Sequence, residues 1–218
     1  MKRVMMILMM AVAIFALRAE QTQDEYRQVI YGRADKIVKT LNIESVEMQD
    51  FIKELIATQY IDLGKINDEY AAKEKEIKAM EISKEEKTAL LDKAFHFQRY
   101  QLQAKHYYFV SQLDANLNYE QVEKVKDGMT MGVYPKTLQA HLEMIPSLKP
   151  EEIAYIKAAL KEAREYAMDC SDSKVKHAWF GKYKGRINNY LSKRGYDLKK
   201  EREAWTERIK QAEAQKNK

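Results

Sequence analysis

Apolar residues recur at steps of three and four along most of the chain, the spacing that places side chains on one face of an α-helix. Only three prolines and seven glycines interrupt the 218 residues. The pattern predicts an all-α protein, a multi-helix bundle. The expected helices cover about residues 22–40, 45–80, 84–116, 119–128, 135 or 136 to 144, 150–169, 174–193 and 198–215.

The second and third expected helices are each longer than about 30 residues, or roughly 45–50 Å at 1.5 Å per residue. A capping box at Ser83-Lys84-Glu85-Glu86 separates them, in which the serine accepts a hydrogen bond from a free backbone N–H and the glutamate returns one. Because the connecting turn is so short, the two helices should form a long antiparallel helical hairpin. Gly64 is interpreted as a bend in its first arm.

The first residues have the layout of a secretory signal peptide. MKR is basic, the next fourteen residues are apolar throughout, and Ala19 offers a cleavage point. Fourteen apolar residues are too few to span a bilayer comfortably. We predict that residues 1–19 are a signal peptide and that residues 20–218 form a single all-helical domain. The mature protein should be periplasmic or secreted and without a stable membrane anchor; the alternative is an uncleaved N-terminal anchor.

Charge is distributed unevenly along the chain. Residues 20–170 carry 21 Lys/Arg against 27 Asp/Glu, whereas residues 171–218 carry 14 against 6. A basic end on an acidic body favours an anionic partner, or docking of the two parts on each other. Because export separates the protein from nucleic acid, we expect no nucleic-acid partner and favour anionic glycans, lipopolysaccharide or acidic segments of other proteins.

HAWFGKYKGRINNYLSKRGYD, residues 177–197, concentrates aromatic, basic and amide side chains in that basic end. On a helix, Phe180, Ile187 and Leu191 share a side that should face the core. Aromatic rings on the adjoining side can cover the apolar face of a sugar, while amide and guanidinium groups bind hydroxyls and carboxylates. The candidate ligand-binding residues here are Trp179, Lys182, Tyr183, Lys184, Arg186, Asn188, Asn189 and Tyr190. The alternative is that the aromatic residues pack and that Arg186 pairs with an acidic residue of the body.

Four stretches carry a family resemblance: EQVEKVKDGMTMG (120–132), MIPSLKPEE (144–152), AREYAMD (163–169) and FGKYKGRINNYLSKRGYD (180–197). They resemble the signature segments of a domain-of-unknown-function family of exported helical proteins from Gram-negative, polysaccharide-degrading bacteria. The resemblance covers most of the mature chain. Members are generally encoded among glycan-degradation genes, so the resemblance implies a role in polysaccharide utilisation. It supplies no established catalytic residues.

The resemblance draws attention to Asp127 and Thr130 as two further candidate ligand-binding residues. They lie beside and within GMTMGVYP, residues 128–135, which two glycines and a proline should keep non-helical. If this segment adjoins the basic and aromatic segment described above, the two could form one pocket. The alternative is a buried bridge from Asp127 to Arg186 or Lys184 that only fastens two parts of the fold.

No motif in the chain specifies a reaction. The four histidines are scattered, and no His-x3-His or Cys-x2-Cys spacing occurs, so we expect no metal site and no cofactor. Our first hypothesis is an exported accessory protein that binds an acidic glycan, an acidic oligosaccharide above all. The second is a periplasmic chaperone or adaptor that holds protein clients along the hairpin, and the third is a glycan-active enzyme. A hairpin of this length also allows two copies to pair as a homodimer.

Overall fold

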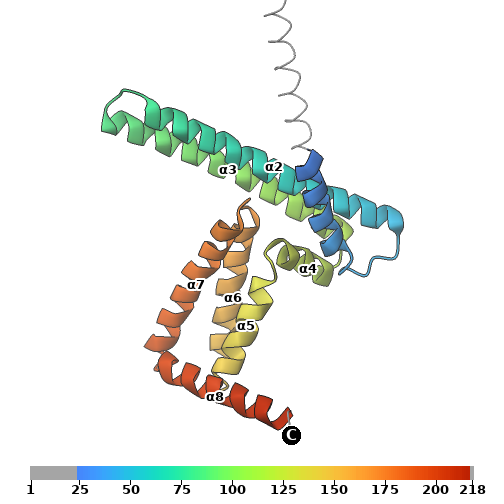
Figure 1. The fold of residues 1–218 in the computed structure, drawn as a ribbon, viewed down its shortest axis with the longest axis vertical. Helices are drawn as coiled ribbons and strands as arrows, with labels where there is room; N and C mark the ends of the chain where they lie inside the picture. Colours follow the sequence, from blue (N-terminus) through green and yellow to red (C-terminus); the bar gives the residue numbers. More distant parts are fainter. Residues whose placement is uncertain (1–23, 217–218) are drawn as a thin grey trace, which may run out of the picture. The chain divides into compact units, whose positions relative to one another are not determined.

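The computed structural model describes residues 24–216, and every regular element in that range is an α-helix (Figure 1). After a helix over residues 24–38, the helices are α2 (Val46–Ala79), α3 (Lys84–Asn116), α4 (Tyr119–Met129), α5 (Val133–Met144), α6 (Pro150–Met168), α7 (Ser173–Lys193) and α8 (Leu198–Lys216). The all-α prediction is thereby confirmed. The expected signal peptide lies outside the described residues. Within them, no helix is long and apolar enough to cross a bilayer.

The chain consists of two compact units, Met1–Ala115 and Asn116–Lys218. α2 and α3 belong to the first unit and lie side by side (Figure 1). Gln98 of α3 donates to Asn67 of α2 at 3.0 Å, and Lys105 contacts Asp62 at 2.5 Å. Because residue numbers fall along α2 as they rise along α3, the two helices are antiparallel. A small core between them contains Leu63, Ile66 and Leu102.

The capping box predicted at the start of α3 is present. The Glu86 N–H donates to Ser83 Oγ at 3.2 Å, and the Ser83 N–H donates to Glu86 Oε2 at 3.0 Å. Asn118 and Gln121 form a second reciprocal pair at the start of α4, at 3.0 and 3.1 Å. Both pairs satisfy backbone N–H groups that the first turn of a helix leaves without an intrahelical acceptor.

Gly64, where the sequence predicts a bend, lies against the first helix of the unit. α2 is helical throughout, and a Cβ atom at Gly64 would lie 2.9 Å from the Tyr26 hydroxyl oxygen. The glycine therefore makes room for the helix over residues 24–38. Further along that helix, the Tyr31 hydroxyl donates to Glu54 Oε2 at 2.7 Å. These two contacts hold the first helix beside α2.

The core of the second unit lies mainly between α6 and α7, and α5 and α8 pack around it. Its buried residues are Met144, Ile145, Ile156, Ala159, Leu160, Ala163, Ala167, Phe180, Tyr183, Ile187 and Leu191. The α6 residues follow the three- and four-residue steps of an apolar helix face. Because this face of α6 packs against the buried side of α7, the opposite side of α7 is left at the surface.

Glu152 fastens the start of α6 to the end of α7. Its side chain is almost fully buried and accepts hydrogen bonds from the Lys149 N–H at 2.8 Å, Arg194 Nε at 3.0 Å and the Tyr196 hydroxyl at 2.6 Å. The hydrogen bonds from Tyr196 and from the Lys149 N–H lower the pKa of Glu152 to about 2. Gly195, at a φ of 95°, makes the turn that brings Arg194 and Tyr196 to this carboxylate.

The segment GMTMGVYP contains less non-helical backbone than the sequence predicts. α4 ends at Met129 and α5 begins at Val133, so only residues 130–132 leave the helical conformation. Pro135 lies in the first turn of α5. Backbone N–H groups in that turn have no intrahelical acceptor, so a residue without an N–H is tolerated there. Met131 and Gly132 adopt positive φ angles of 60° and 65°, which turn the chain between the two helices.

Candidate functional site

The inner side of α7 is apolar, as predicted. Phe180, Ile187 and Leu191 are fully buried. Tyr183, which the sequence assigns to the candidate ligand-binding flank, is only 2% exposed and belongs to the same core. Burial, together with a hydrogen bond to Glu162, raises the pKa of Tyr183 to about 12. The Tyr183 ring is therefore a packing element with a protonated hydroxyl.

Trp179 and Tyr190 are half-buried in the seam between α6 and α7. The Trp179 ring stacks on Tyr166, with centroids 4.5 Å apart and planes inclined by 14°. Tyr190 stacks on Tyr155 in the same way, at 3.9 Å and 19°. Lys182 Nζ lies 4.9 Å from the Trp179 ring centroid. Because both rings already stack on protein neighbours, Trp179 contributes to a ligand site mainly through the lysine that lies beside it.

A row of basic and amide side chains runs along the outer side of α7. Its members follow one another at steps of four, three and four residues, which places them on one helix face, and all of them are exposed. We call this row the α7 basic stripe: Lys182, Arg186, Asn189 and Lys193. Arg186 Cζ lies 4.4 Å from the Tyr183 ring centroid, so the buried tyrosine supports an exposed guanidinium.

α7 contains no acid that would neutralise this stripe. Six Lys/Arg and no Asp/Glu occur between Ser173 and Lys193. Within residues 24–216, none of the three stripe cations forms an ion pair. The stripe is therefore positive, exposed and available to an anion from outside.

The other candidate residues of α7 have separate surroundings. Lys184 is exposed beside His141, and burial together with the charge of Lys184 lowers the pKa of that histidine. Asn188 is half-buried. Lys176 is buried and donates to the Met129 carbonyl at 2.8 Å, so it holds the end of α4 against α7.

Asp127 lies in an ion-pair network that the sequence did not predict. Arg164 of α6, 1% exposed, donates to Asp127 Oδ1 and to Glu123 Oε1, both at 2.6 Å. Lys161 contacts the other oxygen of Glu123 at 2.8 Å. We call the whole cluster the Arg164 network: Glu123, Lys126, Asp127, Lys161, Arg164 and Glu165.

The alternative bridge from Asp127 to Arg186 or Lys184 is not formed, because Arg164 supplies the cation instead. Arg164 lies four residues after Leu160 and four before Met168, both of which are fully buried. A guanidinium at that spacing falls on the buried face of α6 and requires an acidic partner there. This spacing is the sequence signal that would have identified Arg164.

Burial and pairing act differently on the two acids of the network. Burial raises the pKa of Asp127 by more than the hydrogen bond from Arg164 lowers it. Burial also acts to raise the pKa of Glu123, but hydrogen bonds from Lys161 and Arg164 outweigh it and leave that pKa below its ordinary value. Arg164 Nε is buried without a hydrogen-bond partner among the described residues, and the guanidinium carbon lies 5.0 Å from the Tyr134 ring centroid.

Thr130 is turned inward. It is fully buried, and its hydroxyl donates to the Lys126 carbonyl at 2.8 Å, so it closes the last turn of α4. Asp127 thus connects α4 to α6 through the Arg164 network, and Thr130 closes the C-terminal end of α4. Across the described part of the chain, no group of three or more His, Cys, Asp or Glu side chains is arranged as metal ligands would be.

Fold and site together define an all-α protein whose second unit exposes a basic helix face without acids. The chain belongs to the family described as "Protein of unknown function (DUF3826)", which matches residues 27–211. The match includes all four stretches on which the family resemblance rests. Among curated proteins, none matches the chain.

Proposed function

We propose that the protein is an exported accessory protein that binds an acidic glycan in the service of polysaccharide utilisation. The α7 basic stripe is the proposed recognition surface. The observation that supports it is a helix face with three exposed cations, none of which is paired within the described residues. A field of one sign on an exposed surface favours a partner of the opposite charge.

The chemistry of the stripe suits carboxylates attached to sugars. A guanidinium such as that of Arg186 can hold a carboxylate through two parallel hydrogen bonds, and a lysine ammonium adds a point charge. Asn189 supplies both a donor and an acceptor for sugar hydroxyls. The rings of Trp179 and Tyr183 lie close to Lys182 and Arg186, which restricts these cations before any ligand arrives.

The length of the stripe suits an oligomer rather than a single sugar. Lys182 and Lys193 are eleven residues apart, which is about 16 Å along a helix at 1.5 Å per residue. One small anion can engage only one end of such a row. An extended ligand with several anionic groups can engage all three cations, and this favours an acidic oligosaccharide.

Calorimetric titration with acidic and neutral oligosaccharides of equal length tests this proposal on the purified protein. Arg186→Gln should weaken the acidic ligand by about 10-fold or more, because a hydrogen bond to a charged group contributes about 1.5–3 kcal/mol. Lys157→Gln is the matched control, since it removes one exposed positive charge from α6. Equal binding of acidic and neutral ligands, no binding at all, or an equal loss in both variants would refute the proposal.

A further inference from the structure

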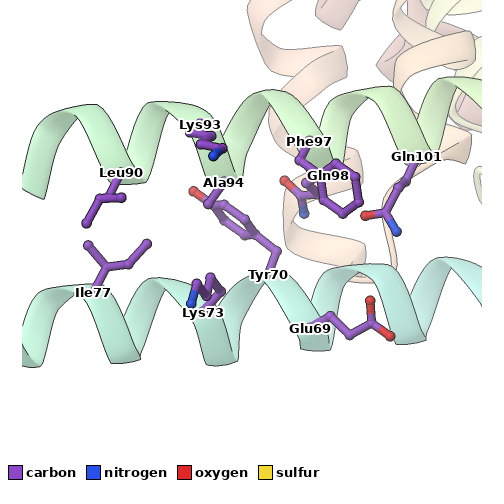
Figure 2. A pocket seen from close by; sticks show the side chains of 10 residues that line it. All are labelled: Glu69, Tyr70, Lys73, Ile77, Leu90, Lys93, Ala94, Phe97, Gln98 and Gln101. Carbon is purple, nitrogen blue, oxygen red and sulfur yellow. The ribbon is translucent and has the colours of Figure 1, made fainter.

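A groove runs along the hairpin of the first unit, between α2 and α3 (Figure 2). Its first part has a volume of about 480 Å³ and is lined by Tyr70, Ile77, Leu90 and Phe97, among others. A second hollow of about 480 Å³ continues it and shares Glu69 and Gln101 with the first. The two hollows therefore form one long groove along the hairpin.

The α3 edge of this groove carries a row of apolar and aromatic side chains, beside Lys93, Lys105 and two glutamines. Leu90, Phe97 and Ala104 follow one another at seven-residue intervals, and Tyr100 and Tyr108 lie one turn after the last two. A seven-residue apolar repeat is the pattern by which one helix packs lengthwise against another. α3 thus presents a seam suited to a helical partner that the described residues do not supply.

The exposed area of this seam is close to what a dimer requires. Phe97, Tyr100 and Tyr108 are 61%, 69% and 60% exposed. At about 150–250 Å² for an aromatic side chain, they leave about 350 Å² of surface to bury, and Leu90 and Ala104 add to it. A standard interface buries about 800 Å² per partner, of which about 450 Å² is apolar.

The α2 edge carries four charged side chains of alternating sign, beside Ile66, Tyr70 and Ile77. Asp62, Lys65, Glu69 and Lys73 line the groove at steps of three and four residues. The outer two already have partners within the unit, whereas Lys65 and Glu69 form no ion pair among the described residues. An antiparallel second copy would place Lys65 opposite Glu69, and Asp62 opposite Lys73, around one two-fold axis near residue 67.

We infer that this groove pairs two copies of the chain, hairpin against hairpin, about a two-fold axis. In such an arrangement each seam of Phe97, Tyr100 and Tyr108 is covered by the other copy. Each Lys65 then meets a Glu69, so every contact occurs twice, as a two-fold interface requires. The charged edge fixes the register, and the aromatic edge supplies most of the buried area.

Light scattering coupled to size-exclusion chromatography, over a range of concentrations, tests the pairing. The purified protein should have twice the monomer mass. Lys65→Glu and Glu69→Lys should each weaken the dimer at least about 10-fold, because each places like charges opposite each other twice. Lys75→Glu, an exposed α2 residue that does not line the groove, should leave the dimer unchanged.

Mixing the two variants provides the decisive result. A copy carrying Lys65→Glu and a copy carrying Glu69→Lys have opposite charges at both contacts, so the mixture should form heterodimers at concentrations at which each variant alone dimerises less. This outcome cannot arise from a change within one helix. A monomeric wild type, a dimer insensitive to both substitutions, or a mixture that stays monomeric would overturn the inference. Thermal melts of each variant show whether it remains folded.

Discussion

Replacement of Arg164 by methionine should destabilise the second unit substantially. The guanidinium is 1% exposed and forms two hydrogen bonds of 2.6 Å to carboxylates. Removing one partner of a buried ion pair costs about 3–5 kcal/mol because a charge is left without compensation. Here the Glu123 and Asp127 side chains remain 20% and 24% exposed, and Glu123 keeps Lys161, so the lower end applies. We expect a loss of about 3 kcal/mol.

Urea unfolding followed by circular dichroism measures this loss, and an unchanged slope of the transition would show that the extent of unfolding is the same. Arg202→Met is the matched control, since Arg202 is exposed on α8 and should contribute less than about 0.5 kcal/mol. Adding Asp127→Asn to Arg164→Met should recover part of the loss, because it removes a carboxylate left without its cation. A loss below about 1 kcal/mol would refute the assignment of Arg164 as the fastening residue.

The same variant has an expected pH dependence. Without Arg164, the pKa of Asp127, already raised by burial, should rise further. A raised pKa in the folded state means that stability falls as the pH increases through that pKa, because the folded state holds its proton more tightly than the unfolded state. The deficit of Arg164→Met should therefore be largest near neutral pH and shrink on acidification. A deficit that is constant with pH would contradict this mechanism.

Two further predictions concern the carboxylate at the end of α6 and the glycine in α2. Glu152→Gln should lower the melting temperature at neutral pH, and the difference from wild type should disappear on acidification. Folding lowers the pKa of Glu152 from 4.5 to about 2, so the stability that this carboxylate contributes is present above pH 4.5 and is lost as the pH falls through the folded-state pKa. A difference that persists at pH 2 would contradict this reasoning. Gly64→Ala should stabilise by up to about 1 kcal/mol, because the exposed Tyr26 ring can move away from the new Cβ. If it destabilises and Tyr26→Phe does not relieve the loss, the obstruction is not the Tyr26 hydroxyl.

The helix bounds could be predicted because the residues that start and stop a helix act on their neighbours in sequence. Ser83 and Glu86 form a capping box within one turn. Gly195 follows the end of α7 and stops the helix because it adopts a positive φ. The start of α5 is the exception. Pro135 fits any position in a first turn, so it does not identify which one it occupies. Met131 takes a positive φ although its side chain gives no signal for that conformation.

The candidate site was harder to predict because its contacts depend on the register between helices. Asp127 and Arg164 are 37 residues apart, and the packing of α4 on α6 decides that they meet. Tyr183 lies three residues after Phe180 and four before Ile187, a spacing that belongs to the core side of α7, although it was assigned to the adjoining side. Its aromatic and basic neighbours instead suggested a ligand-binding flank. Periodicity was the better guide, since burial of a face determines which side chains remain for a ligand.

Some cations in the basic end of the chain are paired within the described residues, whereas those of the α7 basic stripe are not. Arg194 pairs with Glu151 and Glu152, and Arg208 donates to the Glu143 carbonyl at 2.8 Å. Lys210 has an acid on its own helix. Docking between basic and acidic parts therefore does occur within the second unit, but residues outside the stripe perform it.

The charge that remains is concentrated on one exposed face of α7. Lys182 and Arg186 are four residues apart, a spacing at which like charges repel each other on a helix. Their side chains are exposed, so an anion from solution relieves this repulsion without the large desolvation cost of a buried pair. Added salt competes with such an anion because the stripe is screened over about 10 Å at 0.1 M. Salt should therefore weaken ligand binding at the stripe much more than it changes the stability of a core built from buried apolar side chains, and this contrast separates a recognition surface from a structural one.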